Sequence, residues 1–159
     1  MALKFNYNKT TIQQFRKQLK IRENALPILK NKETALRQEE KLRKKIQEQL
    51  IAERDQLQAQ LDGFKSFWTE FPPILQLNQP KVYQKKIVGV KVPELDKITF
   101  QISEVSWWNY PAWIPSGIEI LQQVITLDLK IQIKHLHIEK LSTALKKTTQ
   151  KSFCTIMFR

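Results

Sequence analysis

Two histidines and one cysteine are the side chains best suited to metal or nucleophilic chemistry in this chain. His135 and His137 stand two residues apart, so on a helix they point in different directions and cannot share a metal ion. Cys154 is the sole cysteine, and no Cys/His cluster is present. No serine, cysteine or carboxylate has a persuasive catalytic partner. We therefore expect no catalytic site, no metal and no cofactor.

Glycine placement excludes the common nucleotide-binding loops. The chain has three glycines, Gly63, Gly89 and Gly117, and neither GxxxxGK nor GxGxxG can be written from them. We therefore expect no binding of ATP, a dinucleotide or another small-molecule ligand by this chain alone. The single cysteine also rules out an intrachain disulfide, which favours a reducing compartment. The sequence lacks a signal-peptide core and an apolar run of membrane-span length.

Basic residues are the strongest chemical signal. Lys and Arg number 27 against 15 Asp and Glu, for a formal charge of +12. Such a surplus suits nucleic acid, an anionic membrane face or an acidic protein partner, although it is also typical of the solvated face of a coiled coil. Acidic residues from Glu33 to Glu48 favour i,i+4 pairing over a phosphate-binding tail. The candidate partner contacts in the basic N-terminal third are Lys9, Arg16, Lys20, Lys30 and Lys32.

A second candidate surface is aromatic. Trp107, Trp108 and Trp113 lie within seven positions of one another, together with Tyr110. Tryptophan and tyrosine dominate protein-interface hot spots, so these residues are candidate partner contacts. The competing interpretation is a packed aromatic cluster that pins the inserted segment to the helices. Insertion into a membrane interface is less well supported, because no amphipathic helix is predicted beside the cluster.

A very long first helix is predicted to position the basic residues. Residues 8–71 contain one proline, Pro27, and one glycine, Gly63, and Asn8 is a suitable N-cap. Apolar residues recur at three- and four-residue steps, which indicates a coiled-coil seam, with a slip near residues 39–42. A lone helix cannot bury such a stripe, so it needs a partner helix. The predicted seam is Ile12, Phe15, Leu19, Leu26, Leu29, Leu36, then Leu42, Ile46, Leu50, Leu57, Leu61, Phe64 and Trp68.

Residues 72–115 are predicted to form a connector, a β-hairpin and the Trp-rich segment. Apolar residues alternate over 82–92 and 98–102, which predicts two strands joined by a turn at 93–97. The second helix is predicted over 116–151, with Ser116 as N-cap and Lys134 at one seam position. The expected fold is mostly α: a long antiparallel two-helix coiled coil with a small β-hairpin insert.

The two predicted helices differ in length, about sixty residues against about thirty-five. Antiparallel pairing would leave roughly the first twenty-five residues of the longer helix without a partner, although they carry an apolar stripe. Residues 152–159 drop the heptad pattern and are expected to be an unmatched tail.

Four segments together resemble the central-stalk D-subunit family of V-type ATPases and ATP synthases, most closely its bacterial form. They are residues 8–10, 25–37 (ALPILKNKETALR), 87–93 (IVGVKVP) and 145–151 (LKKTTQK). The resemblance implies a non-catalytic rotor shaft that couples ATP turnover to proton or sodium transport. It also implies partners, namely the A and B subunits of the catalytic hexamer and the F subunit of the central stalk, and a cytoplasmic position peripheral to the cell membrane. Residues 152–159 depart from the family pattern, as a truncation would.

The alternative interpretation is a basic coiled-coil scaffold that binds nucleic acid or an anionic membrane surface. Under the shaft interpretation we expect no nucleic-acid partner, and membrane association only through the complex. Binding to a phosphate polymer weakens steeply with salt, so the salt dependence separates the two.

Overall fold

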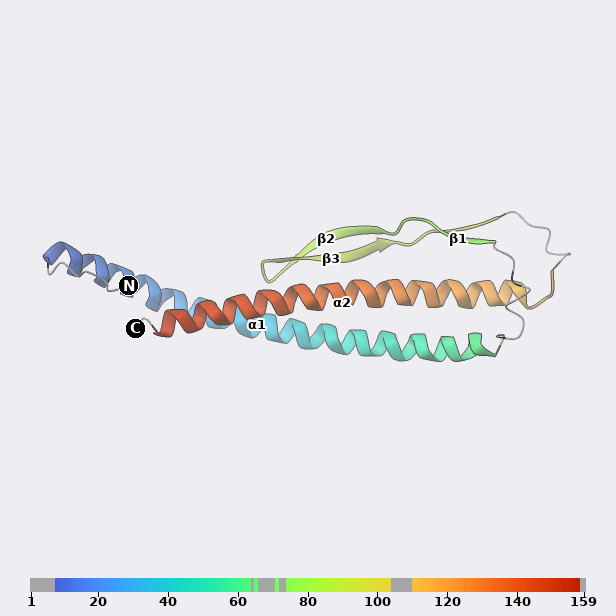
Figure 1. The fold of residues 1–159 in the computed structure, drawn as a ribbon, viewed down its shortest axis with the longest axis horizontal. Coiled ribbons are helices and arrows are strands. Elements are labelled where there is room, and N and C mark those ends of the chain that lie inside the picture. Colours follow the sequence, from blue (N-terminus) through green and yellow to red (C-terminus); the bar gives the residue numbers. More distant parts are fainter. Residues whose placement is uncertain (1–7, 64, 66–70, 72–73, 104–109, 158–159) are drawn as a thin grey trace, which may run out of the picture.

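Two long antiparallel helices form the body of the molecule (Figure 1). The computed structural model describes residues 8–63, 65, 71, 74–103 and 110–157. Helix α1 spans Lys9–Asp62 and helix α2 spans Ile114–Met157, and they pack against each other along most of α2. Four short strands lie between them in sequence. The predicted mostly-α fold, a two-helix coiled coil with a small β insert, is confirmed.

Helix α1 begins where the sequence indicates and ends earlier. Asn8 is the N-cap, and its side-chain oxygen accepts a hydrogen bond from the backbone N–H of Thr10 at 3.5 Å. The helix ends at Asp62 with Gly63 as its C-cap, so the prediction of a helix reaching Phe71 is wrong. Glycine is a weak helix former, which explains the stop. The predicted seam positions Phe64 and Trp68 lie outside the described residues.

The core sits where the two helices meet the inserted strands. Leu36 of α1, Leu141 of α2 and Val92 of the insert are each 0% exposed and pack together. Farther along the seam Leu61 is buried. Leu42, predicted to lie in the seam, is instead 50% exposed. The half-buried positions after Leu36 continue at four- and three-residue steps through Glu40, Arg43, Gln47 and Leu50. The predicted slip near residues 39–42 is therefore not seen, and polar residues occupy the seam in place of this leucine.

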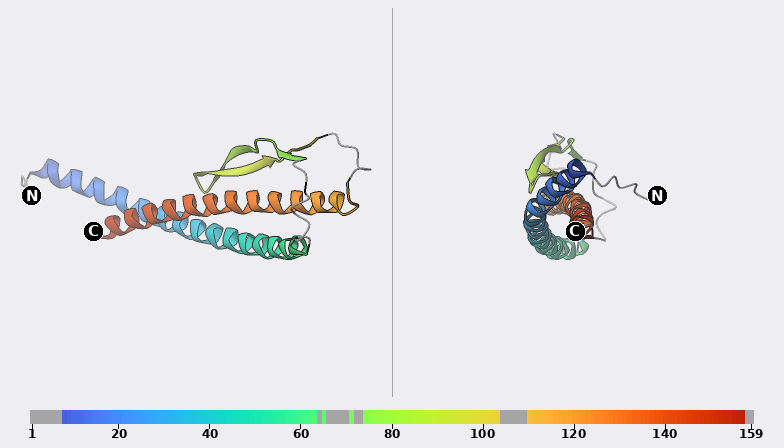
Figure 2. Two further views of the ribbon diagram at one scale, coloured as in Figure 1. Left: turned by 45° about the vertical axis from the view of Figure 1, so that its right-hand side comes forward. Right: turned by 90° about the vertical axis from the view of Figure 1, so that its left-hand side faces the viewer.

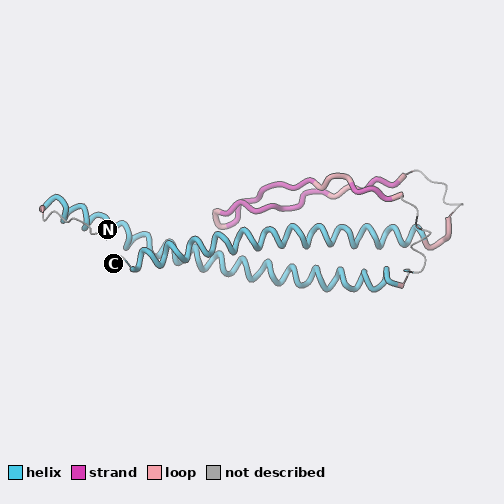
Figure 3. The backbone as a smooth tube through the Cα atoms, viewed as in Figure 1, coloured by secondary structure: helices cyan, strands magenta, loops and turns pink. Residues whose placement is uncertain are grey.

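The insert is a β-hairpin whose flanking segments pair in a second, shorter ladder (Figure 3). Strand β2 (Lys81–Ile87) pairs antiparallel with β3 (Val90–Lys97), and β1 (Leu75–Leu77) pairs antiparallel with β4 (Phe100–Ile102). The predicted turn at 93–97 is wrong, because those residues continue β3. The chain reverses at Val88 and Gly89, whose φ angles are 49° and 80°. Two positive φ angles give a turn whose twist matches that of the strands.

Helix α2 is longer than predicted at both ends. It begins at Ile114, so Ser116 lies inside the helix and is not its N-cap. Pro115 is compatible with this start because the first turn of a helix needs no N–H from it. At the other end the predicted unmatched tail, 152–159, continues α2 as far as Met157. Ser152 is buried there, 6% exposed.

The first turns of α1 extend past the end of α2 in the left view of Figure 2. Helix α1 has 54 residues and α2 has 44. Residues 12–24 are all exposed, whereas Ala25 and Leu26 are half-buried. We call residues 9–24 the projecting end. Within the part of the chain that the structure describes, no helix is long and apolar enough to cross a membrane.

Candidate partner-binding surfaces

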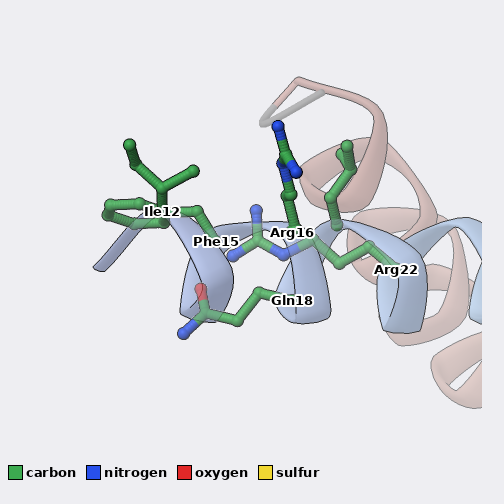
Figure 4. A pocket seen from close by; sticks show the side chains of 6 residues that line it. Ile12, Phe15, Arg16, Gln18 and Arg22 are labelled. Atoms are coloured by element: carbon green, nitrogen blue, oxygen red, sulfur yellow. The ribbon is translucent and has the colours of Figure 1, made fainter. Parts of the chain in front are cut away.

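The projecting end carries an exposed apolar stripe. Ile12, Phe15 and Leu19 lie one helical turn apart and are 49%, 47% and 39% exposed. Together with Arg16, Gln18 and Arg22 they line an open hollow of about 330 Å³. Figure 4 shows the apolar side chains flanked by the guanidinium and amide groups. Such a surface, apolar at its centre and basic at its rim, is suited to binding another polypeptide.

Charge is distributed unevenly along α1. Residues 9–32 contain seven basic residues and one acidic residue. The following stretch is balanced by ion pairs one turn apart, as the sequence indicates: Glu33–Arg37 at 2.7 Å, Glu39–Arg43 at 2.6 Å and Glu40–Lys44 at 2.8 Å. Positive charge that is not balanced within the helix is therefore concentrated toward the projecting end.

The predicted contact lysines and arginine do not form one patch. Lys9, Arg16 and Lys20 are exposed on the projecting end, whereas Lys30 is exposed beyond it, where α1 is already paired. Lys32 reaches the hairpin: its Nζ lies 3.8 Å from where a β-carbon on Gly89 would stand. The structure thus separates a terminal basic group from a lysine at the turn of the hairpin.

The tryptophans fall into two groups. Trp113 is half-buried at the start of α2, and its ring lies 6.2 Å from that of Phe71. A β-carbon on Gly117 would come within 3.3 Å of the same indole, so this glycine makes room for it. These contacts agree with the packing interpretation for Trp113. Trp107 and Trp108 lie outside the described residues.

A polar cluster joins the hairpin to the coiled coil. Glu94 of β3 is ion-paired with Lys85 of β2 at 3.3 Å and with Lys134 of α2 at 3.4 Å. Burial works to raise the pKa of Glu94, but the hydrogen bond from Lys85 and the charges of both lysines outweigh it, so this pKa lies below its usual value. The sequence signal was Lys134, a lysine at a position of the seam where an apolar residue is expected.

His137 lies beside this cluster and is 0% exposed. Neither of its ring nitrogens has a hydrogen-bond partner among the described residues. Burial, reinforced by the charges of Arg43 and Lys134, lowers its pKa, and Glu94 and Glu39 oppose the shift only partly. His137 is therefore a neutral core residue at pH 7. Sequence reasoning considered it only as a metal ligand and missed its burial.

The described residues contain no group of three or more His, Cys, Asp or Glu side chains able to hold a metal ion. The features that stand out are surfaces for partners: the projecting end, and the lysine-rich hairpin.

Comparison with known proteins agrees with this architecture. The model of a family described as the D subunit of ATP synthase matches residues 11–152, which include both helices and the insert between them. A protein of Borreliella burgdorferi (strain ATCC 35210 / DSM 4680 / CIP 102532 / B31), named as the D subunit of a V-type ATP synthase, is 29% identical over 102 residues. That match covers 62% of this chain and 50% of the relative, so the chain spans about half the length of the curated relative that it matches.

Proposed function

We propose that this chain, which belongs to the ATP synthase D-subunit family, is a non-catalytic central-stalk subunit, or rotor shaft, of a V-type complex. It would couple ATP hydrolysis or synthesis to the transport of protons or sodium ions. Its proposed partners are the A and B subunits of the catalytic hexamer and the F subunit of the central stalk. The observation that carries the proposal is a long helical pair from which one basic, apolar helix end projects.

A shaft must resist twisting along its length. The 44 residues of α2 correspond to about 66 Å at 1.5 Å per residue. Buried residues of α2 recur along this length, from Ile118 through Val124, Leu127 and Ile138 to Leu141. Side chains packed along such a seam oppose sliding and unwinding of one helix about the other. This interlocked pair supports a mechanical role.

A shaft must also contact its surroundings without adhering to any one position. Exposed lysines and arginines form ion pairs worth only about 0–1 kcal/mol each, so contacts can be exchanged as the surface moves. We propose that Lys9, Arg16 and Lys20 make such contacts with the hexamer, and that Lys30 and Lys32 do so farther along. In this role the protein would be cytoplasmic and would reach the membrane only through the complex.

The test is assembly with the A, B and F subunits encoded in the same genome. We expect the chain to co-purify with them, and expect the double variant Arg16→Glu/Lys20→Glu to lower its recovery in the complex at least several-fold. Lys140→Glu, an exposed lysine on α2, is the matched control and should assemble normally. Failure of the unaltered chain to assemble would overturn the proposal.

The rival function is binding of nucleic acid or an anionic membrane, which the seven basic residues of 9–32 favour. If the chain binds DNA or anionic vesicles with an affinity that falls steeply with salt, and does not assemble with the A, B and F subunits, the scaffold function replaces the shaft. A shaft should show no DNA retention at moderate salt.

A further inference from the structure

The outer strand of the hairpin has a free edge. Strand β3 packs on α2 on one side of the hairpin and pairs with β2. Figure 1 shows β2 on the far side of β3 from α2. Among the described strands, β2 pairs with β3 alone. One row of its backbone groups is therefore open to an incoming strand.

The register identifies which residues form that edge. Ile87 and Val90 flank the two-residue turn and face each other, so they form a hydrogen-bonded pair. Because pairs alternate along an antiparallel ladder, the N–H and C=O groups of Lys86, Gln84 and Val82 point away from β3. Pro93, which has no N–H, sits opposite Gln84 at one of these non-bonded pairs. The free edge spans about 14 Å at 3.4 Å per residue.

Lysines face each other at both ends of the hairpin. Lys86 is directly opposite Lys91, and Lys81 is directly opposite Lys97. Like charges in directly opposite positions destabilise a ladder. All four lysines are exposed, and none has an acidic partner within 4.0 Å among the described residues. These pairs weaken the isolated hairpin, and an anionic partner would relieve their repulsion.

The acidic residues of the hairpin do not relieve the repulsion between the opposed lysines. Residues 81–97 contain five lysines, Glu94 and Asp96. Glu94 is already paired with Lys85 and Lys134, and Asp96 lines the hollow that Lys130 and Lys134 of α2 also line. At the turn, Lys32 of α1 adds another positive charge. The surplus charge therefore remains at the two ends of the free edge.

We propose that β2 binds an extended acidic segment of a partner protein by strand addition. Main-chain hydrogen bonds at Val82, Gln84 and Lys86 would hold the segment. Its acidic residues would lie at its two ends, about 17 Å apart, since Lys81 and Lys86 are five residues apart. Val82 and Tyr83, 48% and 46% exposed, would contact its central side chains.

Charge complementarity favours an acidic strand over the other possible partners of the free edge. A second copy of the hairpin would bring lysines against lysines, which is how edge strands avoid self-pairing. Lysines on β2 alone would be enough to prevent such self-pairing. Lys91 and Lys97, however, lie on the neighbouring strand β3, so preventing self-pairing does not account for them. Nucleic acid and lipid headgroups share the negative charge but offer no strand to pair with the free backbone. The docking edge would exist whether or not the chain is a shaft subunit.

The test uses the whole 159-residue chain and a synthetic peptide of alternating threonine and valine with two glutamates at each end. We expect saturable binding by calorimetry. Lys86→Glu/Lys91→Glu should weaken it at least tenfold. Gln84→Pro should do the same, because it removes an outward N–H without removing a hydrogen bond of the hairpin. Lys45→Glu, exposed on α1, is the control and should bind normally.

Two control measurements separate loss of the binding edge from loss of the fold. Circular dichroism of every variant should match that of the unaltered chain, and a peptide N-methylated at alternate positions should not bind. Undiminished binding by folded Gln84→Pro would overturn strand addition. Binding to anionic phospholipid vesicles without binding to the peptide would assign the lysines to a membrane surface instead. Concentration-dependent dimerisation abolished by Gln84→Pro would assign the edge to a second copy.

Discussion

The contrast between Leu36 and Leu42 gives the sharpest test of how the two helices are registered. Both are leucines in α1, and the apolar spacing places both in the seam. In the structure Leu36 is 0% exposed, against Leu141 and Val92, whereas Leu42 is 50% exposed. Substitution of each by alanine should therefore have very different effects on the free energy of unfolding.

The magnitude follows from burial. Leu36→Ala removes about three buried carbon groups at roughly 0.8 kcal/mol each, and the unfilled cavity adds to this, for a loss of about 3–4 kcal/mol. For a chain of this size that corresponds to a fall of roughly 6–16 °C in Tm. Leu42→Ala removes half-solvated atoms and introduces a better helix former, so the change should be within about 0.5 kcal/mol.

The assay is urea unfolding followed by circular dichroism at 222 nm, with thermal melting as a second measurement. Leu141→Ala should resemble Leu36→Ala, and the double variant should lose less than the sum of the two, because the cavities merge. If Leu42→Ala destabilises the chain as much as Leu36→Ala, Leu42 packs in the seam as the apolar spacing alone suggested, and the helix register described above is wrong.

Three further outcomes follow from the described residues. As pH falls from 7.5 to 5.5 the free energy of unfolding should drop, because the unfolded chain takes up a proton at His137 near the ordinary pKa of 6.5, whereas the folded chain, whose pKa is lowered, takes it up only at lower pH. His137→Leu should remove this part of the pH dependence, and identical pH profiles would contradict it. Glu94→Gln should cost about 1–3 kcal/mol in urea unfolding, because it leaves the half-buried charge of Lys134 uncompensated, whereas Glu40→Gln should cost about 0.5 kcal/mol or less. Equal losses for the two variants would refute a stabilising role for the Glu94 cluster. By hydrogen exchange, residues 9–24 should exchange faster than 40–60, which have a helix packed against them, and equal protection would be inconsistent with a projecting end.

The helical periodicity of the apolar residues and the N-cap at Asn8 were enough to predict the architecture. The recurrence of leucine and isoleucine at three- and four-residue steps sufficed to predict two unequal antiparallel helices, because a narrow stripe has no other way to be buried. Asn8 marked the start of α1 correctly, since its side chain meets an otherwise unpaired N–H. The exposed stripe of Ile12, Phe15 and Leu19 followed from comparing the predicted helix lengths.

Features that depend on a third element were not predictable from local patterns. Leu42 lies outside the seam because the half-buried positions keep one heptad register through Glu40 and Arg43. Arg43 is ion-paired with Glu39 at 2.6 Å, so a charged residue stands where the apolar spacing predicts a leucine. The turn was misplaced because Pro93 to Lys97 have turn-forming residue types, whereas Val88 holds a positive φ that valine rarely adopts. The burial of His137 depends on packing between two helices and a strand, which one-dimensional spacing does not contain.

Because the hairpin lies on one side of the helical pair, the molecule looks different from different angles around its long axis. Strand β3 is held on α2 by Val92 in the core and by the pairing of Glu94 with Lys134, so the hairpin keeps a fixed angular position around the helical pair. A cylinder without such a hairpin would look the same to its surroundings at every angle. If identical subunits surrounded this molecule, only one side of the ring would face the hairpin at a time, and each subunit would contact a different face of the helical pair.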